Sequence, residues 1–147
     1  MDSSQDVVLY LEEGFDDGGP GNSRGRRLLN LALERCRQLR GKLIVSGVVP
    51  GHAMPWVASF FPQDPVANTC RLLHGRLRRW GTQWVPRDVP WQVAVQVGGV
   101  AGSLGRIVQG SRVGLVVMAG STAVPPAWDA CPLLVLDEAT GSVAEGI

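Results

Sequence analysis

The fold is decided near the N-terminus, where residues 7–13 read Val7-Val8-Leu9-Tyr10-Leu11-Glu12-Glu13. The first five of these residues form an unbroken apolar run rich in β-branched side chains, which is typical of a strand covered on both faces. Such strands belong to parallel sheets whose strands are connected by helices. The two carboxylates follow directly, so they stand at the carboxyl end of the predicted strand. Ligands of open α/β sheets bind at that end.

The rest of the chain alternates between helical and strand patterns. Four further β-prone runs are expected at residues 42–49, 91–97, 113–119 and 132–137. Apolar residues recur at i, i+3 and i+4 spacing in segments near 24–40, 66–80 and 100–109, which predicts three helices. Ser23 is expected to cap the first helix and Gly41 to end it. Right-handed crossovers then give an open, mostly parallel, five-stranded sheet with helices on both faces, a Rossmann-like α/β fold.

Length and composition indicate one domain. The chain has 147 residues, of which 45% are hydrophobic and 18% are charged, and this suits a single core. We expect one domain over residues 1–137 and a flexible tail over residues 138–147, which are small and polar. The final strand, Leu133–Asp137, is then an apolar edge strand that needs a cover. We therefore expect a homodimer formed through it.

Charge and sequence patterning exclude several classes of protein. The 14 basic and 13 acidic residues nearly cancel, so nucleic-acid binding is not expected, and the arginines of the two long helices are interpreted as solvated. No apolar run is long enough to cross a bilayer, and the N-terminus lacks signal-peptide features, which predicts a cytoplasmic protein. Eleven of the basic residues nevertheless lie between Arg24 and Arg79, whereas residues 1–17 hold six acids and no base.

Motifs for catalysis and metal binding are missing from the sequence. The cysteines Cys36, Cys70 and Cys131 form no C-x-x-C pair, and His52 and His74 have no second ligand at a metal-like spacing. The sequence has neither a G-x-S-x-G elbow nor a P-loop, so we expect no enzyme activity. Residues 19–25 contain G-x-G-x-x-x-G, which misses the dinucleotide fingerprint by one residue, and we interpret them mainly as a flexible loop.

Taken in order, these segments resemble the universal stress protein family over nearly the whole chain. Residues 116–121, Val-Val-Met-Ala-Gly-Ser, are similar to that family's fourth strand and its Met-Gly-Ser-type turn. Residues 131–136, Cys-Pro-Leu-Leu-Val-Leu, are similar to its Cys-Pro-Val-Leu-Val-Val final strand. The resemblance implies a universal-stress-protein-like fold, a regulatory or stress-response role, and dimerisation through the final strand.

The chain departs from the phosphate motif of the nucleotide-binding members, which has the form G-x-x-G-(nine residues)-G-[ST]. Gly120 matches the first glycine, but Ala123 stands at the second. Only ten residues separate Gly120 from Cys131, so the spacer, the third glycine and a fourth helix do not fit. Backbone amides of such glycine-rich loops hold phosphates. We therefore expect no bound cofactor, with ATP as the alternative ligand.

If a nucleotide binds, the resemblance implies contacts at the loops after strands one, two and four. The acid after the first strand corresponds to Glu12 or Glu13, and the adenine-edge contact falls at Val48 or Val49, largely through the backbone. On the phosphate side the remaining groups are Gly120, Ser121 and Thr122. From the residues alone, Glu12 and Glu13 are interpreted first as solvated carboxylates at the strand end, and the alternative is that one of them accepts a hydrogen bond from an adenine amino group or a ribose hydroxyl.

Two functions follow from these observations. The leading one is a non-catalytic regulatory protein that binds ATP weakly or not at all and acts through dimerisation or a protein partner. The alternative is an adenine-nucleotide-binding stress protein.

Overall fold

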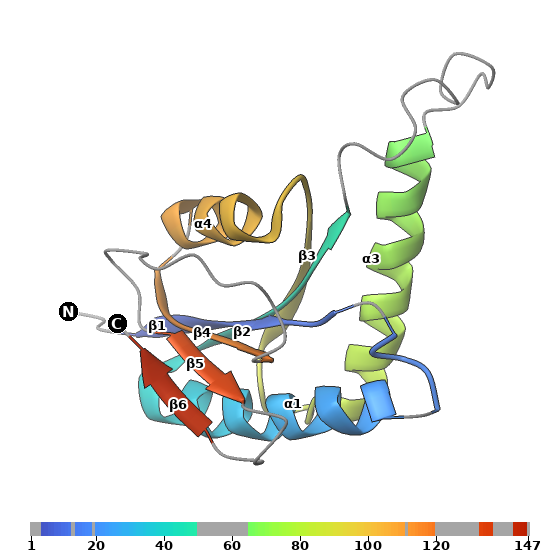
Figure 1. The fold of residues 1–147 in the computed structure, drawn as a ribbon. Coiled ribbons are helices and arrows are strands. Elements are labelled where there is room, and N and C mark those ends of the chain that lie inside the picture. Colours follow the sequence, from blue (N-terminus) through green and yellow to red (C-terminus); the bar gives the residue numbers. More distant parts are fainter. Residues whose placement is uncertain are drawn as a thin grey trace.

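The computed structural model describes residues 4–12, 14–18, 20–49, 65–110, 112–119, 133–136 and 143–146. These residues form one six-stranded sheet in the order β3-β2-β1-β4-β5-β6. The strands are β1 (Gln5–Tyr10), β2 (Arg40–Val49), β3 (Trp91–Val97), β4 (Val113–Ala119), β5 (Leu133–Leu136) and β6 (Val143–Gly146). The helices are α1 (Pro20–Leu39), α3 (Pro65–Trp84) and α4 (Val100–Gly110), and Figure 1 shows their arrangement.

The predicted α/β fold and its parallel pairing are confirmed. Strand β1 pairs in parallel with both β2 and β4, β2 pairs in parallel with β3, and β4 pairs in parallel with β5. The chain moves outward from β1 to β3 and then returns to β4 on the other side of β1. This reversal makes the carboxyl ends of β1 and β4 the topological switch point, beside which ligands of open α/β sheets bind.

Helices cover both faces of the sheet, as expected. Helices α1 and α3 pack on one face, where Leu28, Cys36 and Leu77 join a core with the alternate strand residues Val7, Leu9 and Val45. Helix α4 packs on the other face, where Leu104 and Ile107 contact a second core that includes Val8 and Ile44 (Figure 1). The alternation arises because successive strand side chains point to opposite faces.

The C-terminal end of the sheet differs from the expectation. Val143–Gly146 forms β6, which pairs antiparallel with β5, so these residues are not the flexible tail predicted for 138–147. The sheet therefore has six strands instead of five, and β5 lies between two strands and not at an edge. The expected dimer contact through Leu133–Asp137 assumed that this strand is an exposed edge of the sheet. That assumption is wrong, because β6 pairs with the outer side of β5. Asp137 lies outside the described residues.

Helix α1 also begins and ends differently from the prediction. It starts at Pro20, a residue suited to the first turn, so Ser23 lies inside the helix and residues 20–25 are not a loop. At its other end the left-handed residue is Arg40, with φ of 59°. Gly41 is already part of β2, where an added Cβ would overlap the backbone carbonyl of Gln5. Gly41 is therefore required by the close approach of β1 and not by the helix end.

Candidate functional site

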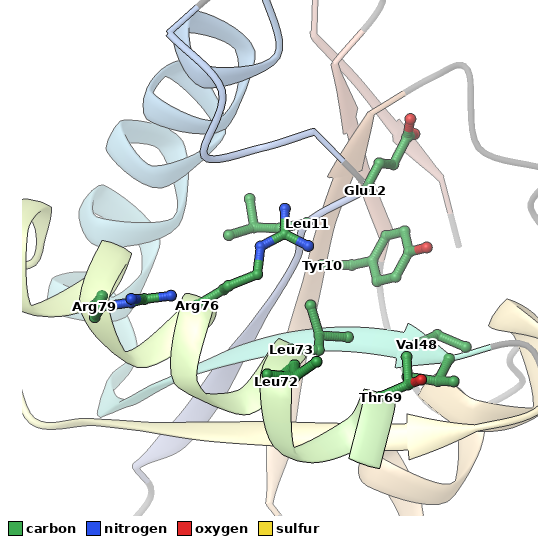
Figure 2. A pocket seen from close by; sticks show the side chains of 10 residues that line it. Tyr10, Leu11, Glu12, Val48, Thr69, Leu72, Leu73, Arg76 and Arg79 are labelled. Atoms are coloured by element: carbon green, nitrogen blue, oxygen red, sulfur yellow. The ribbon is translucent and has the colours of Figure 1, made fainter. Parts of the chain in front are cut away.

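A cavity of about 340 Å³ opens at the carboxyl ends of β1 and β2, against α3 (Figure 2). We call it the β1–β2–α3 pocket. It is lined by Tyr10, Leu11, Glu12, Val48, Val49, Thr69, Leu72, Leu73, Arg76 and Arg79. The first three residues come from the end of β1, the next two from the end of β2, and the other five from α3. The sequence predicted a site at this edge of the sheet, and the pocket lies there.

The pocket brings together two of the predicted site residues, Glu12 and Val48, and also includes Val49. The other three, Gly120, Ser121 and Thr122, lie outside the described residues, as does Glu13. Glu12 is half-buried and lies 3.8 Å from the guanidinium of Arg24, which α1 supplies. The Glu12 carboxylate therefore sits at the rim of the cavity within reach of a cation.

Strand pairing orients the backbone of Val48. The carbonyl of Ser46 accepts the Leu11 N–H at 3.0 Å, so Ser46 faces β1. The carbonyl of Val49 accepts the Gly98 N–H at 2.9 Å, on the side of β3. Backbone groups of alternate residues in a parallel strand face the same neighbour. The N–H and C=O of Val48 therefore face the β1 side, beyond the last residue of β1, and offer one donor and one acceptor at the pocket edge.

Gly47 lets α3 lie directly on the end of β2. A Cβ at this position would lie 2.9 Å from Leu73 Cδ2 and 3.1 Å from Leu77 Cδ1, which is closer than packed atoms approach one another. Leu77 is fully buried, while Leu73 lies at the edge of the core and also lines the pocket. The absence of a side chain at Gly47 therefore lets Leu73, which lines the pocket, pack closely against β2.

The short loop Gly14–Gly18 after β1 docks on α3 through two neighbouring residues. Phe15 is buried and meets the Trp80 ring edge-on, with ring centroids 6.1 Å apart. Asp16 accepts two hydrogen bonds from Arg76, at 2.8 Å from Nε and 2.5 Å from Nη2. The Arg76 guanidinium also lies 5.4 Å from the centroid of the Phe15 ring. These contacts fix the orientation of Arg76 at the pocket wall.

Sequence reasoning missed this pair, because the arginines of α3 were interpreted as solvated. Asp16 and Arg76 are 60 residues apart in the sequence, so no local spacing connects them. The sequence held one signal for such a pair, namely its uneven distribution of charge. Residues 1–17 hold six acids and no base, whereas eleven basic residues lie between Arg24 and Arg79. Oppositely charged segments at a strand end and on a neighbouring helix indicate a contact between them.

The Asp16–Arg76 pair should make stability depend on pH in the acid range. The hydrogen bonds from Arg76 lower the pKa of Asp16 below its usual value of 3.8, although burial opposes this. A lowered folded-state pKa contributes stability that is present above the unfolded-state value and is lost as pH falls through the folded-state value. At pH 6, Asp16→Asn should therefore cost at most about 1 kcal/mol of the free energy of unfolding, because the pair is partly exposed.

Urea unfolding of both proteins between pH 6 and pH 2 tests this expectation. The difference between wild type and Asp16→Asn should shrink once pH falls below 3.8. Asp17→Asn is the matched control, because Asp17 is the exposed neighbour of Asp16 and should change little. A difference that is the same at every pH would show that folding leaves the pKa of Asp16 unchanged, and so that the Arg76 pair does not stabilise the Asp16 carboxylate.

Tyr10 ends β1 beside the pocket, and its buried side chain joins the core on the α4 face of the sheet. Burial raises the pKa of Tyr10 above its usual value, and the Glu12 carboxylate raises it further. The Tyr10 hydroxyl therefore stays protonated at neutral pH and serves as a hydrogen-bond donor.

The two cysteines that the structure describes differ in their burial. Cys36 is buried, donates to the Gly41 carbonyl at 2.9 Å, and has its pKa raised mainly by burial, so it is a structural thiol. Cys70 is half-buried and not bonded to another cysteine, and Cys131 lies outside the described residues. Within the described ranges, no group of three or more His, Cys, Asp or Glu side chains gathers to hold a metal ion. No helix in those ranges is long and apolar enough to span a membrane.

The solved structures that are similar to this chain include three universal stress proteins. The universal stress protein UspA from Lactobacillus plantarum has a TM-score of 0.50 and 12% identity, over 90% of this chain and 98% of that one. A universal stress protein in complex with cAMP has a TM-score of 0.49 and 14% identity, over 81% and 78%. A universal stress protein from Archaeoglobus fulgidus has a TM-score of 0.44 and 15% identity, over 78% and 74%.

No protein-family model and no curated protein matches the sequence. The likeness to UspA, at 12% identity, is a likeness of fold. The chain therefore has a universal-stress-protein-like α/β fold, and its function rests on the site itself.

Proposed function

We propose that this chain is a non-catalytic regulatory protein of the universal-stress-protein type that binds an adenine nucleotide in the β1–β2–α3 pocket. The observation that carries the proposal is the meeting of the Glu12 carboxylate and the Val48 backbone edge in one cavity at the carboxyl ends of two parallel strands. This is the edge at which open α/β sheets bind ligands. The regulatory output is the effect of the bound ligand on a protein partner.

The chemistry of the lining supports an adenine nucleoside as the core of the ligand. The adenine ring presents an amino donor beside a ring-nitrogen acceptor, and the C=O and N–H of Val48 are the complementary pair. A carboxylate such as Glu12 accepts hydrogen bonds from ribose hydroxyls. The volume of about 340 Å³ lies near the lower end of the range of roughly 300–1,000 Å³ for ligand pockets, which suits one nucleoside better than a dinucleotide.

The composition of the lining also supports a non-catalytic role. Among the described residues it contains no histidine, cysteine or serine, its one small hydroxyl side chain is Thr69, and its ionisable side chains are one tyrosine, one glutamate and two arginines. Nucleophilic catalysis needs a nucleophile beside a base that takes its proton. In the described part of the pocket, the carboxylate and the guanidinium groups are therefore suited to binding and orienting a ligand and not to attacking it.

A second candidate function is a regulatory protein that binds a protein partner and no nucleotide. It is favoured by Leu72, which is 61% exposed on α3 although it is a large apolar residue. Arg71, Arg78 and Arg79 lie beside Leu72 along a shallow groove on the same helix. An exposed apolar side chain among cations suits an acidic partner surface.

Acid extraction of the purified protein and titration with adenosine and AMP separate the two candidates. We expect an adenine-absorbing ligand in the extract and saturable binding in calorimetry. Glu12→Gln should weaken adenosine binding about tenfold or more, because a hydrogen bond to a charged acceptor contributes roughly 1.5–3 kcal/mol.

Asp88→Asn is the matched control for Glu12→Gln. It also removes one carboxylate, but Asp88 is exposed and does not line the pocket, so adenosine affinity should stay unchanged. An empty extract together with no binding of adenosine or AMP at millimolar concentration would contradict nucleotide binding and leave partner binding as the function.

A further inference from the structure

We propose that Arg79, with Arg76 beside it, forms a phosphate subsite on α3, so that the pocket takes a nucleoside 5′-phosphate in preference to the free nucleoside. This inference rests on the proposed function and names the part of the ligand that α3 recognises. In this chain the phosphate would be held by side chains of a helix. The stretch between Gly120 and Cys131 is too short for the glycine-rich phosphate motif described above.

Asp16 balances the charge of Arg76 but leaves that of Arg79 in excess. The two guanidinium groups are three residues apart on α3, so they lie on one face of the helix and both line the pocket. Asp16 holds Arg76 through two hydrogen bonds. Arg79 forms no ion pair with a carboxylate in the described ranges. It still acts on this cluster, because its charge contributes to lowering the pKa of Asp16.

The opposite charges of the pocket lie apart. Figure 2 shows Arg76 and Arg79 on one side of the pocket and Glu12 on the other. A ligand that spans the pocket would therefore meet an acceptor for hydroxyl groups at one end and cations at the other. A nucleoside phosphate has this polarity, since its sugar donates hydrogen bonds and its phosphate is anionic.

Guanidinium groups suit a phosphate better than they suit a single carboxylate here. A guanidinium presents N–H donors on more than one edge, and a phosphate group has three terminal oxygens to accept them. Asp16 occupies the Nε and Nη2 edge of Arg76, so a phosphate would meet its Nη1 edge together with the guanidinium of Arg79. Asp16 restricts Arg76 to one orientation, so less conformational entropy is lost when an anion binds beside it.

Binding of adenosine and AMP to three proteins tests the subsite. We expect wild type to bind AMP about tenfold more tightly than adenosine, because the phosphate adds a hydrogen bond between charged groups. Arg79→Gln should abolish this preference while adenosine affinity stays the same. Arg78→Gln is the matched control, since Arg78 is exposed on the same helix and lines the neighbouring groove but not the pocket. It should keep the preference.

Added inorganic phosphate gives a second measurement. It should compete with AMP for wild type, and it should not weaken adenosine binding. Equal affinities for AMP and adenosine in wild type would overturn the phosphate subsite while leaving adenosine binding, and hence the proposed function, intact. A preference that survives Arg79→Gln would also overturn it. Failure of both ligands to bind would overturn the proposed function and the subsite together.

Discussion

Replacing Gly41 with alanine should lower the free energy of unfolding by about 3 kcal/mol or more. Gly41 is the second residue of β2 and lies against the first residues of β1. A methyl group there would overlap the backbone carbonyl oxygen of Gln5 and crowd the backbone nitrogen of Asp6. Backbone atoms in a paired strand cannot rotate away as a flexible side chain can, so β1 and β2 would have to separate.

The surrounding contacts explain why this separation is costly. The pairing register of β1 and β2 shifts between Gln5 and Val7, and the Lys42 N–H donates to the Asp6 carboxylate at 3.0 Å. Both features depend on the close approach of the two strands. Moving them apart would break this hydrogen bond and disturb β1, which lies between β2 and β4 in the sheet. The pocket would change as well, because the end of β1 lines it.

Gly75→Ala is the matched control for Gly41→Ala. Gly75 lies within α3, and an added Cβ would meet nothing within 4 Å. Alanine should therefore stabilise the protein by roughly 0.5–1 kcal/mol, because it restricts the unfolded chain and favours the helix. Urea unfolding monitored by circular dichroism measures both variants. Equal effects of the two substitutions would refute the close approach at Gly41.

Leu104→Ala should lower the free energy of unfolding by about 2–5 kcal/mol. Leu104 is fully buried and is the α4 residue at the centre of the second core, which includes Val8, Ile44 and Val116. Removing its side chain leaves a cavity between α4 and the sheet. Helix α4 contains Gly102 and Gly105, so its own propensity is low and its stability depends on this packing.

Leu72→Ala provides the control for Leu104→Ala. The same atoms are removed, but Leu72 is 61% exposed, so the expected change is within about 0.5 kcal/mol. Thermal and urea unfolding should rank the two variants in this order. Hydrogen exchange should also show faster exchange in α4 of Leu104→Ala. A cost below that of Leu72→Ala would mean that α4 does not pack on the sheet.

Much of the fold could be predicted because its signals are local. Buried strands appear as continuous apolar runs and helices as apolar residues at i, i+3 and i+4, and both patterns are independent of distant residues. Strand β6 was missed because Val143–Gly146 is only four residues long and contains a glutamate and a glycine. It becomes a strand through its antiparallel pairing with β5, which the sequence pattern does not encode.

Part of the lining of the candidate pocket could be predicted for the same reason. Glu12 and Val48 follow from the positions of strand ends, which local patterns locate well. Asp16, Arg76 and Arg79 were missed, because a charged helix residue has the same sequence pattern whether it is solvated or faces a pocket. The distinction depends on which loop packs against the helix, and here Phe15 decides it by docking against Trp80.

The order of apolar and polar residues was thus sufficient for the class of fold, the parallel pairing of its strands and the edge where a ligand would bind. The shape and charge of the pocket came from folding, since they depend on contacts between residues far apart in the sequence, such as Asp16 and Arg76, which are 60 positions apart. Gly41 illustrates the difference. In the sequence it is a plausible helix end, whereas in the sheet it is the point where two backbones meet. A local pattern describes the conformation of a segment, and only packing determines what that segment touches.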